Sequence, residues 1–67
     1  MQFCITIHGA LPEGIADRLW RQIEWTKSNL TVLDKNAYIY GDCGETVIDK
    51  IVAEAERTGY PVEVDRR

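Results

Sequence analysis

Residues 36–42 read Asn-Ala-Tyr-Ile-Tyr-Gly-Asp, and the interpretation of the whole chain depends on this stretch. Its side chains alternate: Ala37 and Ile39 fall on one side of an extended strand, and Tyr38 and Tyr40 fall on the other. This pattern is typical of a central strand in a sheet whose aliphatic face is covered by helices. The two tyrosines then lie side by side on the uncovered face, and they are the first candidates for a functional surface.

The segments around this stretch predict three further strands and two helices. Alternating side chains predict the strands over residues 1–8, 30–34 and 61–65. Residues 34–36 form a predicted hairpin turn, in which asparagine tolerates the left-handed conformation. Apolar residues at three- and four-residue spacing predict one helix over residues 12–27 and a second that ends before Gly59. The apolar stripe of the first helix consists of Ile15, Ala16, Leu19, Trp20 and Ile23.

Three signals set the ends of the second helix. Asp42 and Glu45 have the spacing of a capping box, in which the first side chain accepts a hydrogen bond from the first turn. A similar pattern begins four residues later at Thr46, so the start of the helix stays open by one turn. Gly59 is expected to adopt the left-handed conformation after the last turn, and Pro61 prevents the helix from continuing.

The predicted order is β-α-β-β-α-β, which is the ferredoxin-like split β-α-β plan of an α+β protein. We expect a single domain over residues 1–67, with a four-stranded antiparallel sheet. Right-handed crossovers place both helices on one face of the sheet, with the first and third strands at its centre. Many unrelated functions use this plan, so the function has to be argued from the surface.

The face without helices can be assigned from the alternation of each strand. Its predicted side chains are Gln2, Cys4, Thr6, His8, Thr31, Leu33, Tyr38, Tyr40, Glu63 and Asp65. In one interpretation, the tyrosines only favour strand formation and pack across the strands. In the other, this face binds a second copy or another protein, because tyrosine combines an apolar ring with a hydroxyl that stays in water. The candidate interface residues on this face are Thr6, His8, Thr31, Leu33, Tyr38 and Tyr40.

Trp25 is a separate candidate for an interaction. It lies off the apolar stripe of the first helix, close to Arg18 and Arg21 on the helical wheel. The arginine side chains can cover its ring as a cation–π patch, or the ring can serve as an anchor for a partner protein.

Single-stranded nucleic acid is the alternative partner for the open face. Two aromatic residues two positions apart on the third strand resemble the base-stacking platform of RNA-recognition motifs. The resemblance covers only these two positions, because the stretch lacks the basic residue and glycine that begin that family's signature. The first strand also offers no outward aromatic residue, and Glu63 and Asp65 would repel phosphate. The net charge of −3 weighs against nucleic acid as well.

No metal site, cofactor or enzymatic centre is predicted. Cys4 and His8 share a face, but four residues of strand separate them by about 13 Å, which is too far for one ion. The loop after the first strand lacks the C-x-x-C of small heavy-metal-binding domains. Cys4 and Cys43 fall on opposite faces, which predicts two free thiols. His8 is the only histidine, and it has no evident nucleophile beside it.

The sequence therefore predicts a small, non-enzymatic module for protein interaction or oligomerisation. We expect a protein partner or a second copy of the chain. Nucleic-acid binding is the second hypothesis, and a small-ligand or thiol redox module is the third. No membrane contact is expected, because no apolar run approaches the roughly 20 residues of a membrane span. Without a leader segment, the expected location is the cytoplasm.

Overall fold

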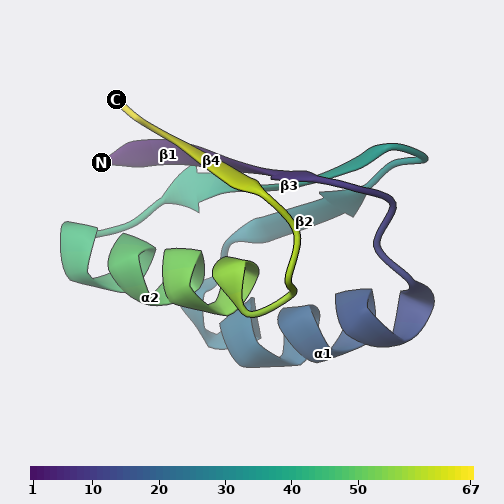
Figure 1. Ribbon diagram of the computed structural model, residues 1–67. Helices are drawn as coiled ribbons and strands as arrows, with labels where there is room; N and C mark the ends of the chain where they lie inside the picture. Colours follow the sequence, from purple (N-terminus) through teal and green to yellow (C-terminus); the bar gives the residue numbers. More distant parts are fainter.

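The computed structural model describes residues 1–67, and it has two layers, a sheet and a pair of helices (Figure 1). The elements are β1 (Gln2–His8), α1 (Glu13–Ile23), the short 3-10 helix η1 (Glu24–Thr26), β2 (Asn29–Val32), β3 (Asn36–Asp42), α2 (Glu45–Glu56) and β4 (Val62–Arg66). The alternating stretch at residues 36–42 is β3, with the predicted bounds.

The four strands form one antiparallel sheet in the order β2-β3-β1-β4. Strands β1 and β3 are central, as predicted. Each of the helices α1 and α2 connects two strands that have another strand between them, and both helices lie on the lower side of the sheet in Figure 1. The chain therefore has the predicted α+β fold with the ferredoxin-like split β-α-β arrangement.

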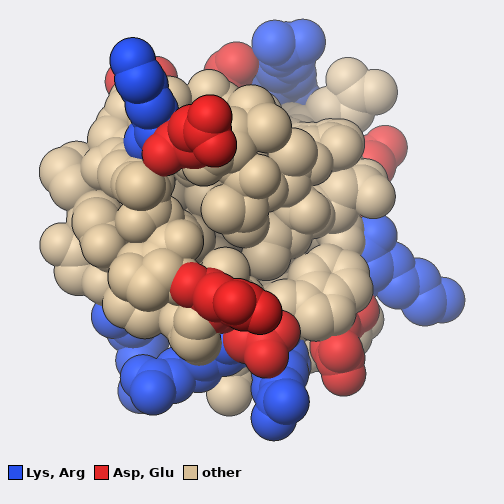
Figure 2. Space-filling view, turned by 90° about the vertical axis from the view of Figure 1, so that its right-hand side faces the viewer, with Lys and Arg blue, Asp and Glu red and all other residues tan.

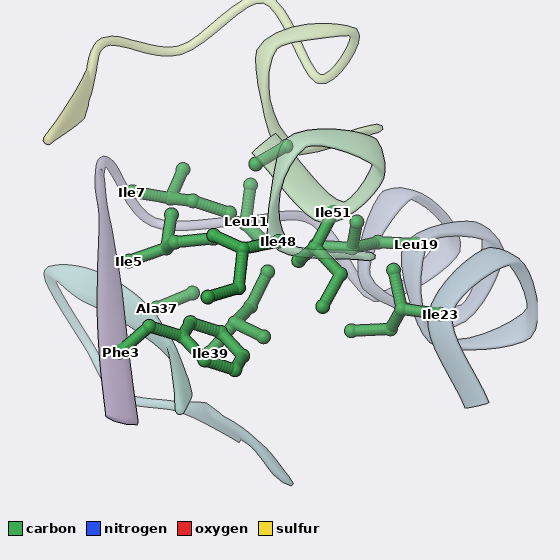
Figure 3. Packing of buried hydrophobic residues seen from close by; sticks show 11 residues of the cluster. Phe3, Ile5, Ile7, Leu11, Leu19, Ile23, Ala37, Ile39, Ile48 and Ile51 are labelled. Atoms are coloured by element: carbon green, nitrogen blue, oxygen red, sulfur yellow. The ribbon is translucent and has the colours of Figure 1, made fainter. Parts of the chain in front are cut away.

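The core lies between the sheet and the two helices, as Figure 3 shows. Its buried side chains are Phe3, Ile5, Ile7, Leu11, Leu19, Ile23, Ala37, Ile39, Ile48, Ile51 and Ala55. The strand residues among them occupy alternate positions of β1 and β3, because those side chains point to the helices. Full burial of one isoleucine is worth about 1.5–3 kcal/mol, so the alternation fixes which face of the sheet is covered.

The edge strands are less well covered than the alternation predicts. Val32 pairs with Ala37, and Val64 pairs with Ile5, so both valines lie on the helix side of the sheet. Both nevertheless stay exposed, because they stand at the two outer edges of the sheet.

Two predictions about the helix ends are wrong. The first helix does not remain α-helical to Lys27, because it tightens into η1 after Ile23 and stops where Lys27 turns left-handed at φ 61°. Asp42 does not cap α2: Gly44 occupies the N-cap position, and no side chain caps the helix. Asp42 instead belongs to β3, and its Oδ1 lies 2.7 Å from the amino group of Met1.

The predicted turns are partly confirmed. Gly59 has a φ of 86°, which is the left-handed conformation expected after the second helix. The β2–β3 hairpin also forms, and the Leu33 N–H donates a hydrogen bond to the Asn36 carbonyl oxygen at 2.9 Å. None of its residues is left-handed, however, and Asn36 already belongs to β3.

Candidate functional site

The open face of the sheet brings six of the seven candidate residues together. Thr31, Tyr38 and Thr6 stand in one row across β2, β3 and β1, and Glu63 of β4 completes the row. Asn29, Tyr40, Cys4 and Asp65 form the next row in the same way. His8 lies at the end of β1 opposite Asn36, and Leu33 follows β2 at the hairpin.

The two tyrosines differ in how far they are exposed. Tyr40 has 42% of its surface exposed, whereas Tyr38 is half-buried among its neighbours. Leu33 is 55% exposed and lines a shallow depression together with Tyr38. Leu33 at the hairpin and the two tyrosines of β3 therefore expose apolar and aromatic surface on a face that no helix covers.

Hydrogen bonds hold both tyrosine rings against the sheet. Asn36 Nδ2 donates to Tyr38 Oη at 3.2 Å, and Thr31 Oγ1 and Tyr40 Oη lie 3.4 Å apart. Both hydroxyls thus have partners within the sheet, while the rings remain partly accessible. A partner that packs on the rings would bury apolar area without removing a hydroxyl from its hydrogen bond.

Charged side chains lie at the border of this face rather than at its middle. Glu63 and Asp65 stand on β4, and His8 Nε2 lies 4.0 Å from Glu63 Oε1. Figure 2 shows the hairpin end, where several basic side chains gather along the lower edge, on the helix side, and acidic side chains lie above and among them. The two carboxylates of β4, one strand beyond β1 on the same face, would repel a phosphate backbone, which weighs against nucleic acid on this face.

Trp25 lies apart from the other six candidates. It belongs to η1 in the helix layer, where its Nε1 donates to the Gln22 carbonyl oxygen at 2.9 Å. The sequence places Arg18 and Arg21 beside it, but the cation over its ring is Lys50 of α2, with Nζ 5.8 Å from the ring centroid. The ring is therefore partly occupied by contacts within the chain, and it does not extend the open face.

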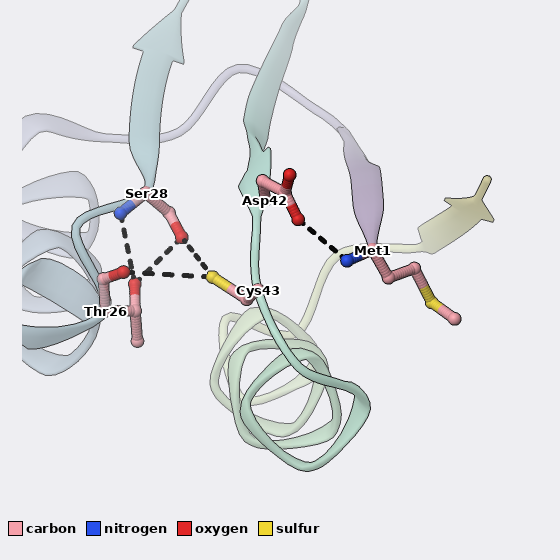
Figure 4. Close-up of polar contacts among 5 residues, drawn as sticks. All are labelled: Met1, Thr26, Ser28, Asp42 and Cys43. Atoms are coloured by element: carbon pink, nitrogen blue, oxygen red, sulfur yellow. Dashed lines mark hydrogen bonds and ion pairs between the residues drawn. The ribbon is translucent and has the colours of Figure 1, made fainter.

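The two cysteines lie on opposite sides of the sheet, as predicted, and both are free thiols. Cys4 stands on the open face opposite Tyr40, while Cys43 packs against the core. Cys43 Sγ lies 3.6 Å from Ser28 Oγ, and it donates to the Thr26 carbonyl oxygen at 3.8 Å (Figure 4). This cluster joins the end of η1 to the end of β3, so a structural role accounts for Cys43.

Trp20 is a surface residue that the sequence analysis missed. Its spacing predicts a place in the buried stripe of the first helix, yet 39% of its surface is exposed. On a helical wheel Trp20 lies about 60° from Ile23, at the margin of the stripe. This marginal position is the feature of the sequence that indicates its exposure. Trp20 and Tyr40 line the same groove beside β2.

No group of three or more His, Cys, Asp or Glu side chains is placed to hold a metal ion. Neither helix has the length and apolar character required to cross a membrane.

No protein-family model matches the sequence, and the comparison with curated proteins finds no match.

Proposed function

We propose that this protein is an interaction module that forms a homodimer through the open face of its sheet. The observation that carries the proposal is the uncovered apolar surface of Tyr38 and Tyr40 on the central strand β3, together with Leu33 at the adjoining hairpin. An interface of ordinary size buries roughly 800 Å² per partner, which is about a fifth of the 4383 Å² surface of this chain. The open face of a four-stranded sheet is the natural place for such an area.

The charges on the face favour one way of packing two copies. If the twofold axis runs parallel to the strands, β3 of one copy lies over β1 of the other, and β4 lies over β2. Glu63 and Asp65 then face the uncharged side chains of β2 in the second copy. A twofold axis perpendicular to the strands would instead place β4 of one copy over β4 of the other. The carboxylates of both copies would then lie together, which is unfavourable. Face-to-face sheets also pack with nearly aligned strands, as this arrangement requires.

A small chain has a second reason to self-associate. A domain of this length buries only about 60% of the surface that its unfolded chain exposes. Apolar area that is buried between copies adds about 25 cal/mol per Å² before the costs of association are subtracted. The dimer would therefore stabilise the fold of each copy as well as form the functional surface.

Light scattering after size-exclusion chromatography tests the proposal over a series of concentrations. We expect a dimer for the unchanged protein and a monomer for the Tyr38→Ser, Tyr40→Ser double variant. Trp25→Phe serves as the matched control because it changes an aromatic residue outside the open face. A monomer at every concentration up to about 1 mM, equivalent to less than about 4 kcal/mol of association free energy, would exclude the dimer.

A further inference from the structure

The outer edge of β2 presents unpaired backbone groups. The Leu33 N–H bonds the Asn36 carbonyl oxygen, and Leu33 and Asn36 continue the register in which Val32 faces Ala37. Hydrogen-bonded and non-hydrogen-bonded pairs alternate along an antiparallel ladder. Leu30 and Val32 therefore direct their N–H and C=O groups away from β3. No other strand of the chain pairs with this edge.

A groove of about 420 Å³ runs beside this edge, between β2 and α1. Its lining includes the exposed ring of Trp20, the side chain of Leu30 and the ring of Tyr40. Glu13 and Asp17 of α1 also line it, and no lysine or arginine does. The groove thus combines an apolar floor, two carboxylates and a free strand edge.

The opposite edge of the sheet is protected in a way that the β2 edge is not. Three of the five residues of β4 are charged, whereas none of the four residues of β2 is. Arg66 Nη2 also bonds Asp49 Oδ1 of α2 at 2.7 Å, which places an ion pair over that border of the sheet. Charged side chains on an edge strand discourage pairing with another chain, so only the β2 edge lacks this protection.

We propose that the β2 edge binds an extended, basic segment of a partner protein, which adds a fifth strand to the sheet. Its backbone pairs with the outward groups of Leu30 and Val32, as in other cases of strand addition. Its lysine or arginine side chains extend over Trp20, where their aliphatic stems pack on the ring and their charged ends reach Glu13 and Asp17. The alternate side chains, apolar or β-branched, lie toward Tyr40 on the open side of the sheet.

Charge selects a foreign segment over a second copy of β2. The segment Asn29–Val32 contains no basic residue that could meet the carboxylates of the groove. Pairing two β2 edges about a twofold axis would also bring the α1 helices of both copies to the same border, each with its Glu13 and Asp17. The edge site shares Tyr40 with the proposed open-face dimer, but Trp20 lies outside that face and Tyr38 does not line the groove, so substitutions at Trp20 and Tyr38 distinguish the two sites.

Titration with a ten-residue peptide of alternating lysine and valine, followed by ¹⁵N–¹H NMR, tests the edge site. We expect shifts at the Leu30 and Val32 amides and at the Trp20 indole, together with slower hydrogen exchange of those two amides. The matched peptide of alternating glutamate and valine should bind at least tenfold more weakly. Equal binding of the two peptides, or shifts that centre on another surface, would overturn the proposal.

Substitutions then separate this site from the open face. Trp20→Ala and Asp17→Lys should each weaken the lysine–valine peptide about tenfold. Val32→Pro removes one outward N–H without breaking a bond to β3, and Val64→Pro is its counterpart on the β4 edge. Peptide binding should fall with the first proline and not with the second, and an equal loss would contradict strand addition at β2.

Two further results distinguish the two surfaces. Tyr38→Ser should weaken the dimer and leave peptide binding unchanged, so either proposal can fail while the other holds. The amide chemical shifts of Leu30 and Val32 can also be measured without peptide at several protein concentrations. A dependence on concentration would identify a second copy as the occupant of the edge and overturn the choice of a basic segment.

Discussion

Ile39 and Tyr40 are neighbours in β3, yet they belong to two very different surfaces. The isoleucine is fully buried beneath both helices, and the tyrosine is 42% exposed on a face with no helix. Ile39 belongs to a cluster of buried aliphatic and aromatic side chains, whereas Tyr40 faces Cys4 on β1 and its hydroxyl lies 3.4 Å from Thr31 Oγ1. The residue types on the covered face are therefore set by the need to bury apolar side chains away from water. Those on the open face are not under this constraint, so contact with a partner can set them.

The largest expected effect is on the covered face. Ile39→Ala should lower the free energy of unfolding by about 2–5 kcal/mol, because it leaves a cavity in a core that cannot fully collapse. Urea denaturation followed by circular dichroism measures the loss. Tyr40→Ala is the matched control one residue along the strand. If both variants lose the same stability, the contrast between the two faces is wrong.

An intermediate effect is expected at Gly9, where the covered side meets the β1–α1 loop. A methyl group added there would overlap the ring of Tyr60, which packs against the core. Gly9→Ala should therefore lower the unfolding free energy by about 1–3 kcal/mol, as overpacking does.

The double variant Gly9→Ala, Tyr60→Leu tests whether overlap with the Tyr60 ring causes this loss of stability. It should recover part of the loss if overlap with the ring is responsible. No recovery in denaturation would indicate that the loop backbone at Gly9 requires glycine for another reason. Gly14→Ala serves as a control, because an added methyl group at Gly14 meets no atom within 4 Å.

The smallest effect on stability is expected for the open face. Tyr38→Ser should lower the unfolding free energy of the monomer by no more than about 1 kcal/mol, the range of a single cross-strand pair. The unfolding free energy should be measured at a protein concentration low enough to keep the chain monomeric. A loss that is as large as that of Ile39→Ala would show that the tyrosine supports the fold, and would remove the reason to assign it to an interface.

The sequence was sufficient for the parts of the fold that hydrophobic burial determines. Alternation in β1 and β3 predicted the covered face, because a shift by one residue would have exposed Ile5, Ile7 and Ile39. The order of the elements then followed from helical spacing between the strands. The rows on the open face were predictable for the same reason, since they are the other half of the same alternation.

The remaining features depend on competition between local partners, which residue spacing does not reveal. Asp42 has capping-box spacing, but pairing of β3 with β1 places it opposite Gln2 and beside the amino group of Met1. Trp20 lies at the margin of the apolar stripe, and it stays exposed where α1 meets the short edge strand β2. The edge groove could not be seen from the sequence because it requires α1 and β2 to be placed side by side.

The central position of β1 has a consequence for how the chain folds as it is synthesised. β1 is made before its two neighbours in the sheet, β3 and β4, and Phe3 pairs with Arg66 of the last strand. Until Val62–Arg66 leaves the ribosome, one side of β1 has no partner strand. Closing so long a loop is slow, because its entropic cost is met before the contacts form. We therefore expect the nascent chain to remain unfolded until its last strand has emerged.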